Sequence, residues 1–374
     1  MVQDIHSDPG AVNTFIKATR GKYVPVAIAG QGKSGQVWYA LQKSLIKQSS
    51  SASQIPALRS QVCAVKVFVS EIPGFLPKKK QTESYIDSVI REFGQAEISK
   101  ESSNKEIAAL LELKRDPGPF PHRLPQLIEA LTLSEAEKGM PALISMKAIQ
   151  GFQLSEFMTV ATLFQNCPFP EALMYHLFVQ LMEGLEFLHN RNPSMSKTDI
   201  QPINIMVDPT GSEVPGLPNF VFIDFGGSRL HIDNNSKMGN RYSVYRELHR
   251  LAKRHHVCDT EVPVPEEEVS RLQYEVCTHH NKDWKGFVDA LRFANQMMSE
   301  SFAMGVRLVG GGPDQELRSG GRLFEMAKVK RTKANDINHR IIDALMSWTA
   351  REHGRFPSEE EVREAIAVDE KRCR

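Results

Sequence analysis

Three glycines between two apolar segments are the first residues of this chain whose spacing could serve chemistry. Gly30, Gly32 and Gly35 fit the pattern G-x-G-x-x-G-x-V. Glycine is needed where backbone N–H groups approach a phosphate closely or where φ is positive, although a tight hairpin turn explains the pattern equally well. The flanking segments 23–29 and 36–41 both predict strands. We therefore expect a β-hairpin over a nucleotide, and not the strand-to-helix turn of a dinucleotide site.

A lysine lies within the apolar segment 62–69 (VCAVKVFV), which predicts a third strand. A buried amine with apolar neighbours needs an anionic partner, because an unpaired buried charge is costly. Lys66 could therefore bind nucleotide phosphates while a carboxylate on a nearby helix holds it in place. The alternative is a lysine on the solvent-facing side of an edge strand.

An aspartate follows directly on the apolar segment 220–223, which predicts another strand. Asp224 precedes Phe225 and Gly226. A carboxylate at a strand end beside a phosphate site is a natural Mg²⁺ ligand, because Mg²⁺ takes hard oxygen ligands together with substrate phosphates. The same three residues could also form a simple turn.

These segments follow one another in an order that resembles the protein-kinase-like family. The A-V-K sequence at 64–66 is similar to the V-A-I-K strand of that family, and D-F-G at 224–226 matches its metal-binding motif. Asp199, five residues before Asn204, resembles its catalytic loop. Alone, this last pair could be a turn between a helix and a strand. The resemblance covers about residues 23–256.

The resemblance implies that Lys66 contacts the α- and β-phosphates of ATP and is paired with a carboxylate on the following helix. We prefer Glu106 as this partner, because residues 106–113 (EIAALLEL) give a helix with one packed face. Glu92 and Glu97 are the alternatives, since they lie nearer to Lys66 in the sequence.

The resemblance also implies roles for the later motifs. Asp199 would position the attacking hydroxyl, Asn204 and Asp224 would bind Mg²⁺, and the purine would lie against residues 146–149. The predicted catalytic residues are thus Asp199, Lys66 and Glu106. The predicted nucleotide-binding residues are Gly30, Gln31, Gly32, Lys33, Ser34, Gly35, Val37, Lys66, Met146 and Ile149.

The periodicity of the chain changes near residue 150, with mostly strands before it and mostly helices after it. One helix has leucines on a single face, at 173, 177, 181, 185 and 188. With the resemblance, this predicts an α+β, two-lobed protein-kinase-like fold: a small antiparallel β-sheet N-lobe with one main helix, and a mostly α-helical C-lobe. The expected parts are an N-terminal extension (1–22), the N-lobe (23–149), the C-lobe with its catalytic and metal-binding loops (150–256) and a helical C-terminal part of the C-lobe (257–374).

The sequence departs from the family in the catalytic loop. Lys197 and Thr198 stand where the family has His-Arg, which argues against control by a phosphorylated activation loop. Gln201 stands where serine/threonine protein kinases carry a lysine, and glutamine cannot neutralise a γ-phosphate. Lys197 or Lys33 could supply that charge. The Asp–Asn–Asp set still favours catalysis.

The segment after Gly226 is short, because a helical pattern begins at Tyr242. This leaves little room for a peptide-binding activation segment and is typical of small-molecule kinases and divergent microbial kinases. A second register would take residues 264–266 as the end of the segment and residues 283–284 as the start of the next helix. We favour the short version.

Two features lie beyond residue 257. Two His/Cys pairs, at 255/258 and at 277/280, could bind zinc, although buried thiols and exposed imidazoles explain them better. Ser358 and Glu361 form a capping box that predicts the start of the last helix.

Composition excludes several classes of protein. The 374 residues carry 46 basic and 45 acidic side chains, which argues against a protein that coats nucleic acid or an anionic membrane. The five cysteines are an odd number and predict no disulfide framework. There is no apolar leader or membrane-spanning run, so we expect a cytoplasmic or nuclear protein.

Three functions are therefore considered. The first is a divergent serine/threonine protein kinase, which uses ATP and Mg²⁺ and takes a protein hydroxyl as acceptor. The second is a kinase for a small-molecule alcohol. The third is a nucleotide-binding pseudokinase scaffold that is weakly active or inactive.

Overall fold

The computed structural model of the chain describes most of its 374 residues. The described ranges are 9–32, 35–48, 54–68, 95–119, 123–131, 142–163, 170–210, 213–254, 287–292, 323–333 and 336–373. Lys33, Ser34, Glu92 and both His/Cys pairs lie outside them, and so do residues 264–266 and 283–284.

A five-stranded sheet forms the first part of the chain, in the order β1-β2-β3-β5-β4. Every neighbouring pair is antiparallel, and the segments rich in β-branched and aromatic residues supply the strands. The predicted strand segments 23–29, 36–41 and 62–69 supply β1, β2 and β3, whereas the segment 220–223 lies in a separate sheet. The strands of the five-stranded sheet are β1 (Tyr23–Gly32), β2 (Gly35–Gln42), β3 (Cys63–Phe68), β4 (Leu127–Leu131) and β5 (Leu143–Lys147).

Helices cover this sheet. α1 (Pro9–Ala18) packs Phe15 against Trp38 with ring centroids 5.0 Å apart, so the segment expected as an extension contributes to the core. α5 (Gln95–Arg115) buries Ile107 and Leu110 against the sheet. The short helices α2 (Lys43–Gln48) and α3 (Ile55–Ser60) lie between β2 and β3 in the sequence. We call the sheet with α1, α2, α3 and α5 the sheet part.

The rest of the described chain is mainly helical, and we call it the helical part. The predicted leucine face on α7 is confirmed, since all five leucines are buried. The helices are α6 (Leu154–Leu163), α7 (Glu171–Asn190), α8 (Asn234–Arg254) and α12 (Asp336–His353). The short strands are β6 (Phe152–Gln153), β7 (Met195–Ser196), β8 (Ile205–Asp208), β9 (Asn219–Phe222) and β10 (Arg229–Leu230).

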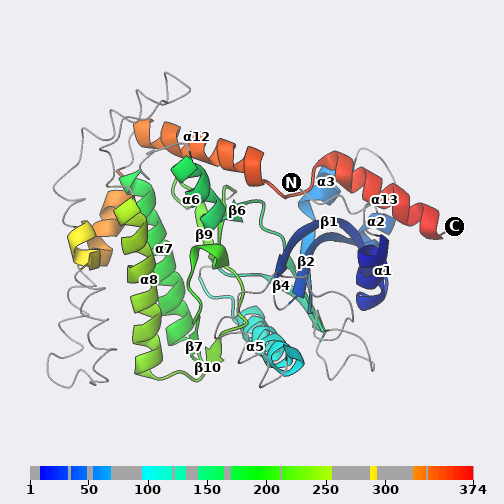
Figure 1. Cartoon of the computed structure of the whole chain (residues 1–374), viewed down its shortest axis with the longest axis horizontal. Coiled ribbons are helices and arrows are strands. Elements are labelled where there is room, and N and C mark those ends of the chain that lie inside the picture. The colour runs from blue at the N-terminus through cyan, green and yellow to red at the C-terminus, as the bar shows by residue number, and fades with distance from the viewer. Residues whose placement is uncertain are drawn as a thin grey trace, which may run out of the picture.

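The last helix does not lie where the sequence suggested. α13 (Glu359–Cys373) was expected to extend the helical C-lobe, but it packs against β1 and α3 of the sheet part. Figure 1 shows α12 (orange) beside α6 and α13 (red) beside α3. Val362 and Ala365 provide the apolar face for this contact, since both are buried with Val24 and Val26. The capping box of Ser358 and Glu361 is confirmed, with hydrogen bonds in both directions.

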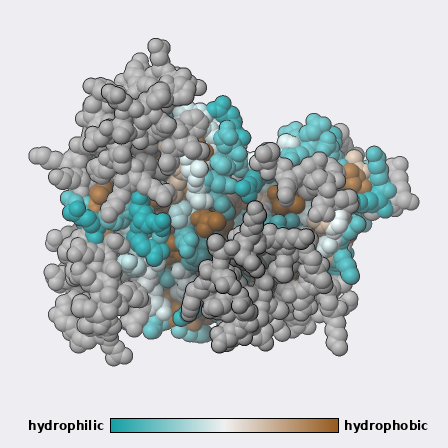
Figure 2. All heavy atoms as spheres, viewed as in Figure 1, coloured by the Kyte–Doolittle hydropathy of each residue, from teal (hydrophilic) through white to brown (hydrophobic). Residues whose placement is uncertain are grey.

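Few large hydrophobic side chains of the described residues are exposed: Leu111, Ile128, Ile203 and Val329. On the face drawn in Figure 2, hydrophobic residues appear as separate small patches among hydrophilic ones. Within the described ranges, none of the helices combines the length and the apolar character needed to cross a membrane. The chain is thus an α+β protein with an antiparallel N-terminal sheet and a mainly helical C-terminal part, an arrangement compatible with a kinase-like fold.

Candidate active site

A cavity of about 630 Å³ brings together residues from most of the predicted motifs. Its walls come from the β1–β2 hairpin, from β3 and α5, from the segment after β5 and from the loops that precede β8 and follow β9. The predicted site residues in its lining are Gly30, Gln31, Gly32, Gly35, Val37, Lys66, Glu106, Met146, Ile149, Asn204 and Asp224. Lys33 and Ser34 lie outside the described residues.

The three glycines of the β1–β2 hairpin differ in why a side chain is absent at their positions. A side chain at Gly35 would collide with the carbonyl oxygen of Val67, so close strand packing requires glycine there. Gly32 has nothing within 4 Å of a hypothetical Cβ, and Gly30 has only Arg355, at 4.0 Å. None of the three has a positive φ, contrary to one reason considered for the motif. The first two glycines therefore leave open space at the cavity wall.

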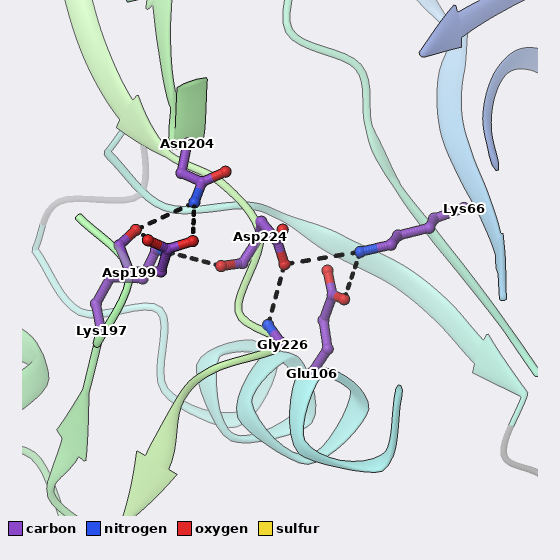
Figure 3. Close-up of polar contacts among 7 residues, drawn as sticks. All are labelled: Lys66, Glu106, Lys197, Asp199, Asn204, Asp224 and Gly226. Atoms are coloured by element: carbon purple, nitrogen blue, oxygen red, sulfur yellow. Dashed lines mark hydrogen bonds and ion pairs between the residues drawn. The ribbon is translucent and has the colours of Figure 1, made fainter. Parts of the chain in front are cut away.

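Lys66 and Glu106, which were expected to pair, lie 2.6 Å apart between Nζ and Oε2 (Figure 3). Lys66 is 7% exposed and Glu106 is 2% exposed. Because β3 has a neighbouring strand on each side, the alternative of a solvent-facing lysine on an edge strand is wrong. Burial would lower the pKa of Lys66, but the carboxylates of Glu106 and Asp224 outweigh it and raise this pKa. The amine is therefore held as a charged, oriented donor.

Asp224 presents a charged carboxylate to the same amine. Its Oδ1 lies 3.7 Å from Lys66 Nζ and accepts a hydrogen bond of 3.2 Å from the N–H of Gly226. The backbone of Asp224 has φ of +58°, a conformation that aspartate tolerates better than most residues. Burial would raise the pKa of Asp224, but Lys66 and the Gly226 N–H hold it below its ordinary value. The side chain is 44% exposed, so the carboxylate remains accessible to a cation.

Asp199 and Asn204 form a second pair beside the cavity. Asn204 Nδ2 donates to Asp199 Oδ2 at 2.7 Å and to the Asp199 carbonyl at 3.2 Å. Asp199 is exposed and lies next to the cavity without being part of its lining. The N–H of Ile223 donates to the Asn204 carbonyl at 2.9 Å, which ties this loop to the strand end that carries Asp224.

Lys197 has a different position from the one we had considered for it. It is 1% exposed, and Nζ donates to the carbonyl oxygens of Asp199 at 2.9 Å and Asp224 at 2.7 Å. Burial lowers the pKa of Lys197 to about 8, although Asp224 and Asp199 oppose this shift. An amine engaged with backbone carbonyls is not directed at a γ-phosphate, so that hypothesis is not supported for Lys197. The sequence showed that a lysine stands at position 197 in place of the histidine of the family, but it could not show where the amine of Lys197 points.

The segment after Gly226 is shorter than expected. Arg229 and Leu230 form β10, which pairs with β7, and α8 begins at Asn234 instead of Tyr242. Asp233 caps this helix, since its Oδ1 accepts a hydrogen bond of 2.8 Å from the N–H of Ser236. Only residues 227–233 separate the D-F-G segment from α8.

The oxygen donors of the site fit Mg²⁺. Asp224 offers an ionised carboxylate. The amide nitrogen of Asn204 is engaged with Asp199, so its oxygen is the atom that a metal would use. Mg²⁺ is usually bound by one or two such protein groups together with substrate phosphates. In the part of the chain that the structure describes, no group of three or more His, Cys, Asp or Glu residues could hold a metal without such help.

The lining also contains residues that were not anticipated, among them Tyr39, Gln126, Glu156, His353 and Arg355. The last two come from the end of α12 and the segment after it, more than 100 residues from the D-F-G motif. No local pattern could have identified them, because their position depends on α13 returning to the sheet.

Comparison with known proteins gives partial support for a kinase relation. No protein-family model matches the chain. Human receptor-interacting serine/threonine-protein kinase 3 is 28% identical over 112 residues, which are 30% of this chain and 20% of that protein. The match therefore spans about a fifth of the length of this curated relative. Part of the chain is thus similar to a serine/threonine-protein kinase.

Proposed function

We propose that this chain is an ATP- and Mg²⁺-dependent phosphotransferase with a two-lobed protein-kinase-like fold, which moves the γ-phosphate of ATP to a hydroxyl group. The observation that carries the proposal is the Lys66–Glu106 ion pair of 2.6 Å, with Asp224 3.7 Å from the same amine, on the wall of a cavity of about 630 Å³. A buried ion pair adds little to stability, so the presence of this lysine supports a binding role.

The groups on the cavity wall support the binding of a nucleotide. Lys66 would donate to the α- and β-phosphates while Glu106 holds it, and the open space at Gly30 and Gly32 would admit the phosphate chain. The purine would lie against residues 146–149. When bound by Asn204 and Asp224, Mg²⁺ would neutralise charge on the phosphate oxygens.

Transfer would depend on Asp199. The acceptor oxygen would attack the γ-phosphorus, forming a new O–P bond, while the bond from this phosphorus to the β–γ bridging oxygen breaks and ADP leaves. The acceptor proton would pass to the carboxylate of Asp199. The hydrogen bond from Asn204 supports this role, because it fixes one oxygen of that carboxylate.

A protein serine or threonine is the acceptor we favour. Asp199 is exposed at the edge of the cavity, where a peptide could reach it, and part of the chain is similar to a serine/threonine-protein kinase. The short segment 227–233 favours a small-molecule alcohol as the second candidate. The engagement of Lys197 with backbone carbonyls favours the third, a scaffold that binds nucleotide with little turnover.

Incubation with γ-labelled ATP and Mg²⁺ tests the proposal and separates the candidates. The reaction would contain generic protein substrates and, in a parallel sample, a pool of small hydroxyl metabolites. We expect label on protein. Label on a metabolite would support the second candidate, and label on neither, with ATP still bound, would support the third.

A further inference from the structure

The segment 354–358, which we call the strap, crosses from the helical part to the sheet part. It joins α12, which packs against α6, to α13, which packs against β1 and α3. Figure 1 shows the chain passing between these two helices. The strap therefore connects the two parts along a path separate from the segment after β5.

The strap is held against the sheet part by specific contacts. Arg59 Nε donates to the carbonyl of Pro357 at 2.6 Å, and its guanidinium lies 4.9 Å from the centre of the Phe356 ring. Phe356 also packs edge-on against Tyr39, with ring centroids 5.5 Å apart. Lys43 on α2 pairs with Asp369 on α13 at 2.7 Å. These contacts fix the backbone position of Arg355 between them and α12.

Arg355 bridges the glycine hairpin and the helical part. Nη1 donates to the carbonyl of Ala29 at 3.1 Å, and Nη2 donates to Glu156 Oε1 at 2.9 Å. Ala29 directly precedes Gly30 in β1, and Glu156 lies in the first turn of α6. Glu156 is itself oriented, because its Oε2 accepts a hydrogen bond of 2.9 Å from the N–H of Gln153. Both side chains line the nucleotide cavity.

We infer that Arg355 is a positioning residue for the nucleotide. The inference rests on the proposed function and adds to it a residue outside the kinase-like motifs. The planar guanidinium bonds two partners at a fixed separation, which a single amine cannot do. It therefore sets the start of the glycine hairpin relative to α6 and so determines how closely the hairpin covers the phosphates. Loss of the bridge lowers nucleotide affinity and leaves the transfer step unchanged.

Titration calorimetry with ADP and Mg²⁺ tests this inference on the full chain. Arg355→Gln should raise the Kd about tenfold, which corresponds to one charge-assisted hydrogen bond. Arg355→Lys should raise the Kd less, because it keeps the charge and one partner. Arg363→Gln is the matched control, since Arg363 lies on α13 in an exposed pair with Glu360 and should leave the Kd within about twofold. In turnover assays, Arg355→Gln should raise the KM for ATP and leave kcat unchanged.

Glu156→Gln approaches the same bridge from α6 and replaces the first variant if that one does not fold. The double variant Arg355→Gln/Glu156→Gln should have a Kd for ADP no higher than that of the single variant with the higher Kd, because both substitutions break the same bridge. If wild type binds ADP and both single variants bind it with the affinity of wild type, the inference is wrong and the proposed function stands. If both variants lose thermal stability without any change in Kd, Arg355 is only structural. If wild type itself binds no ADP, the proposed function fails, and the inference fails with it.

Discussion

The buried amine of Lys197 holds together the two loops that carry the acidic residues of the site. Its hydrogen bonds to the carbonyls of Asp199 and Asp224 join segments that lie 25 positions apart in the sequence. Lys66 differs from Lys197, because its amine pairs with side-chain carboxylates on the cavity wall and not with backbone carbonyls. Two buried lysines thus have different tasks, one in fixing backbone and the other in presenting charge.

The Lys66–Glu106 pair gives a prediction at this scale. Lys66→Met should lower the free energy of unfolding by about 3–5 kcal/mol, because it leaves the carboxylate of Glu106 buried without its partner. Lys66→Met/Glu106→Leu should recover most of that stability, since apolar residues replace the ion pair. Neither variant should bind ADP with the affinity of wild type. Urea unfolding and ADP titration measure both effects, and tight ADP binding by the stable double variant would exclude Lys66 as a phosphate ligand.

At the scale of elements, α7 shows how the helical core constrains titratable groups. His176 and His189 are both buried on this helix. Nε2 of His176 lies 3.0 Å from the carbonyl of Pro218, and Nε2 of His189 lies 3.1 Å from Oδ1 of Asn240. Burial lowers the pKa of His176 to about 3 and that of His189 to about 4. Both imidazoles are therefore neutral in the folded protein at neutral pH.

These two histidines predict acid sensitivity. Between pH 6.5 and 4 the unfolded chain binds protons that the folded chain does not, so stability falls as the pH is lowered through this range. Each histidine contributes a slope of about 1.4 kcal/mol per pH unit. His189→Gln should reduce the slope by about that amount, because the folded chain then lacks one of the two imidazoles held neutral by burial. Urea unfolding at several pH values measures the slope, and equal slopes in wild type and His189→Gln would contradict the assignment.

The close packing of the β1–β2 hairpin on β3 gives a second prediction at the scale of elements. Gly35→Ala should destabilise the protein by about 1–3 kcal/mol, because the new methyl group meets the carbonyl of Val67 on β3. Gly32→Ala is the matched control in the same hairpin, where the methyl group meets open space. Thermal unfolding compares the two variants. Equal stability would mean that β2 and β3 do not pack as closely as described.

At the scale of the whole molecule, the sequence predicted those features that depend on interactions between residues close together in the chain. The strands, the leucine face of α7 and the Ser358–Glu361 capping box follow from side-chain periodicity and short-range hydrogen bonds. The start of α8 was missed because residues 234–241 are mostly polar and lack an apolar period. The packing of α1 and α13 on the sheet, and hence the position of Arg355, depends on contacts between distant segments that no local pattern encodes.

The central claim concerns transfer of phosphate, and Asp199→Asn tests it most directly. The measurement pairs turnover of γ-labelled ATP with ADP titration on the same protein, and uses Asp343→Asn, at an exposed position on α12, as the control. We predict that Asp199→Asn lowers turnover at least about 100-fold, because the hydroxyl proton loses its acceptor, while the Kd for ADP stays near that of wild type. Turnover equal to that of wild type in Asp199→Asn would contradict the account.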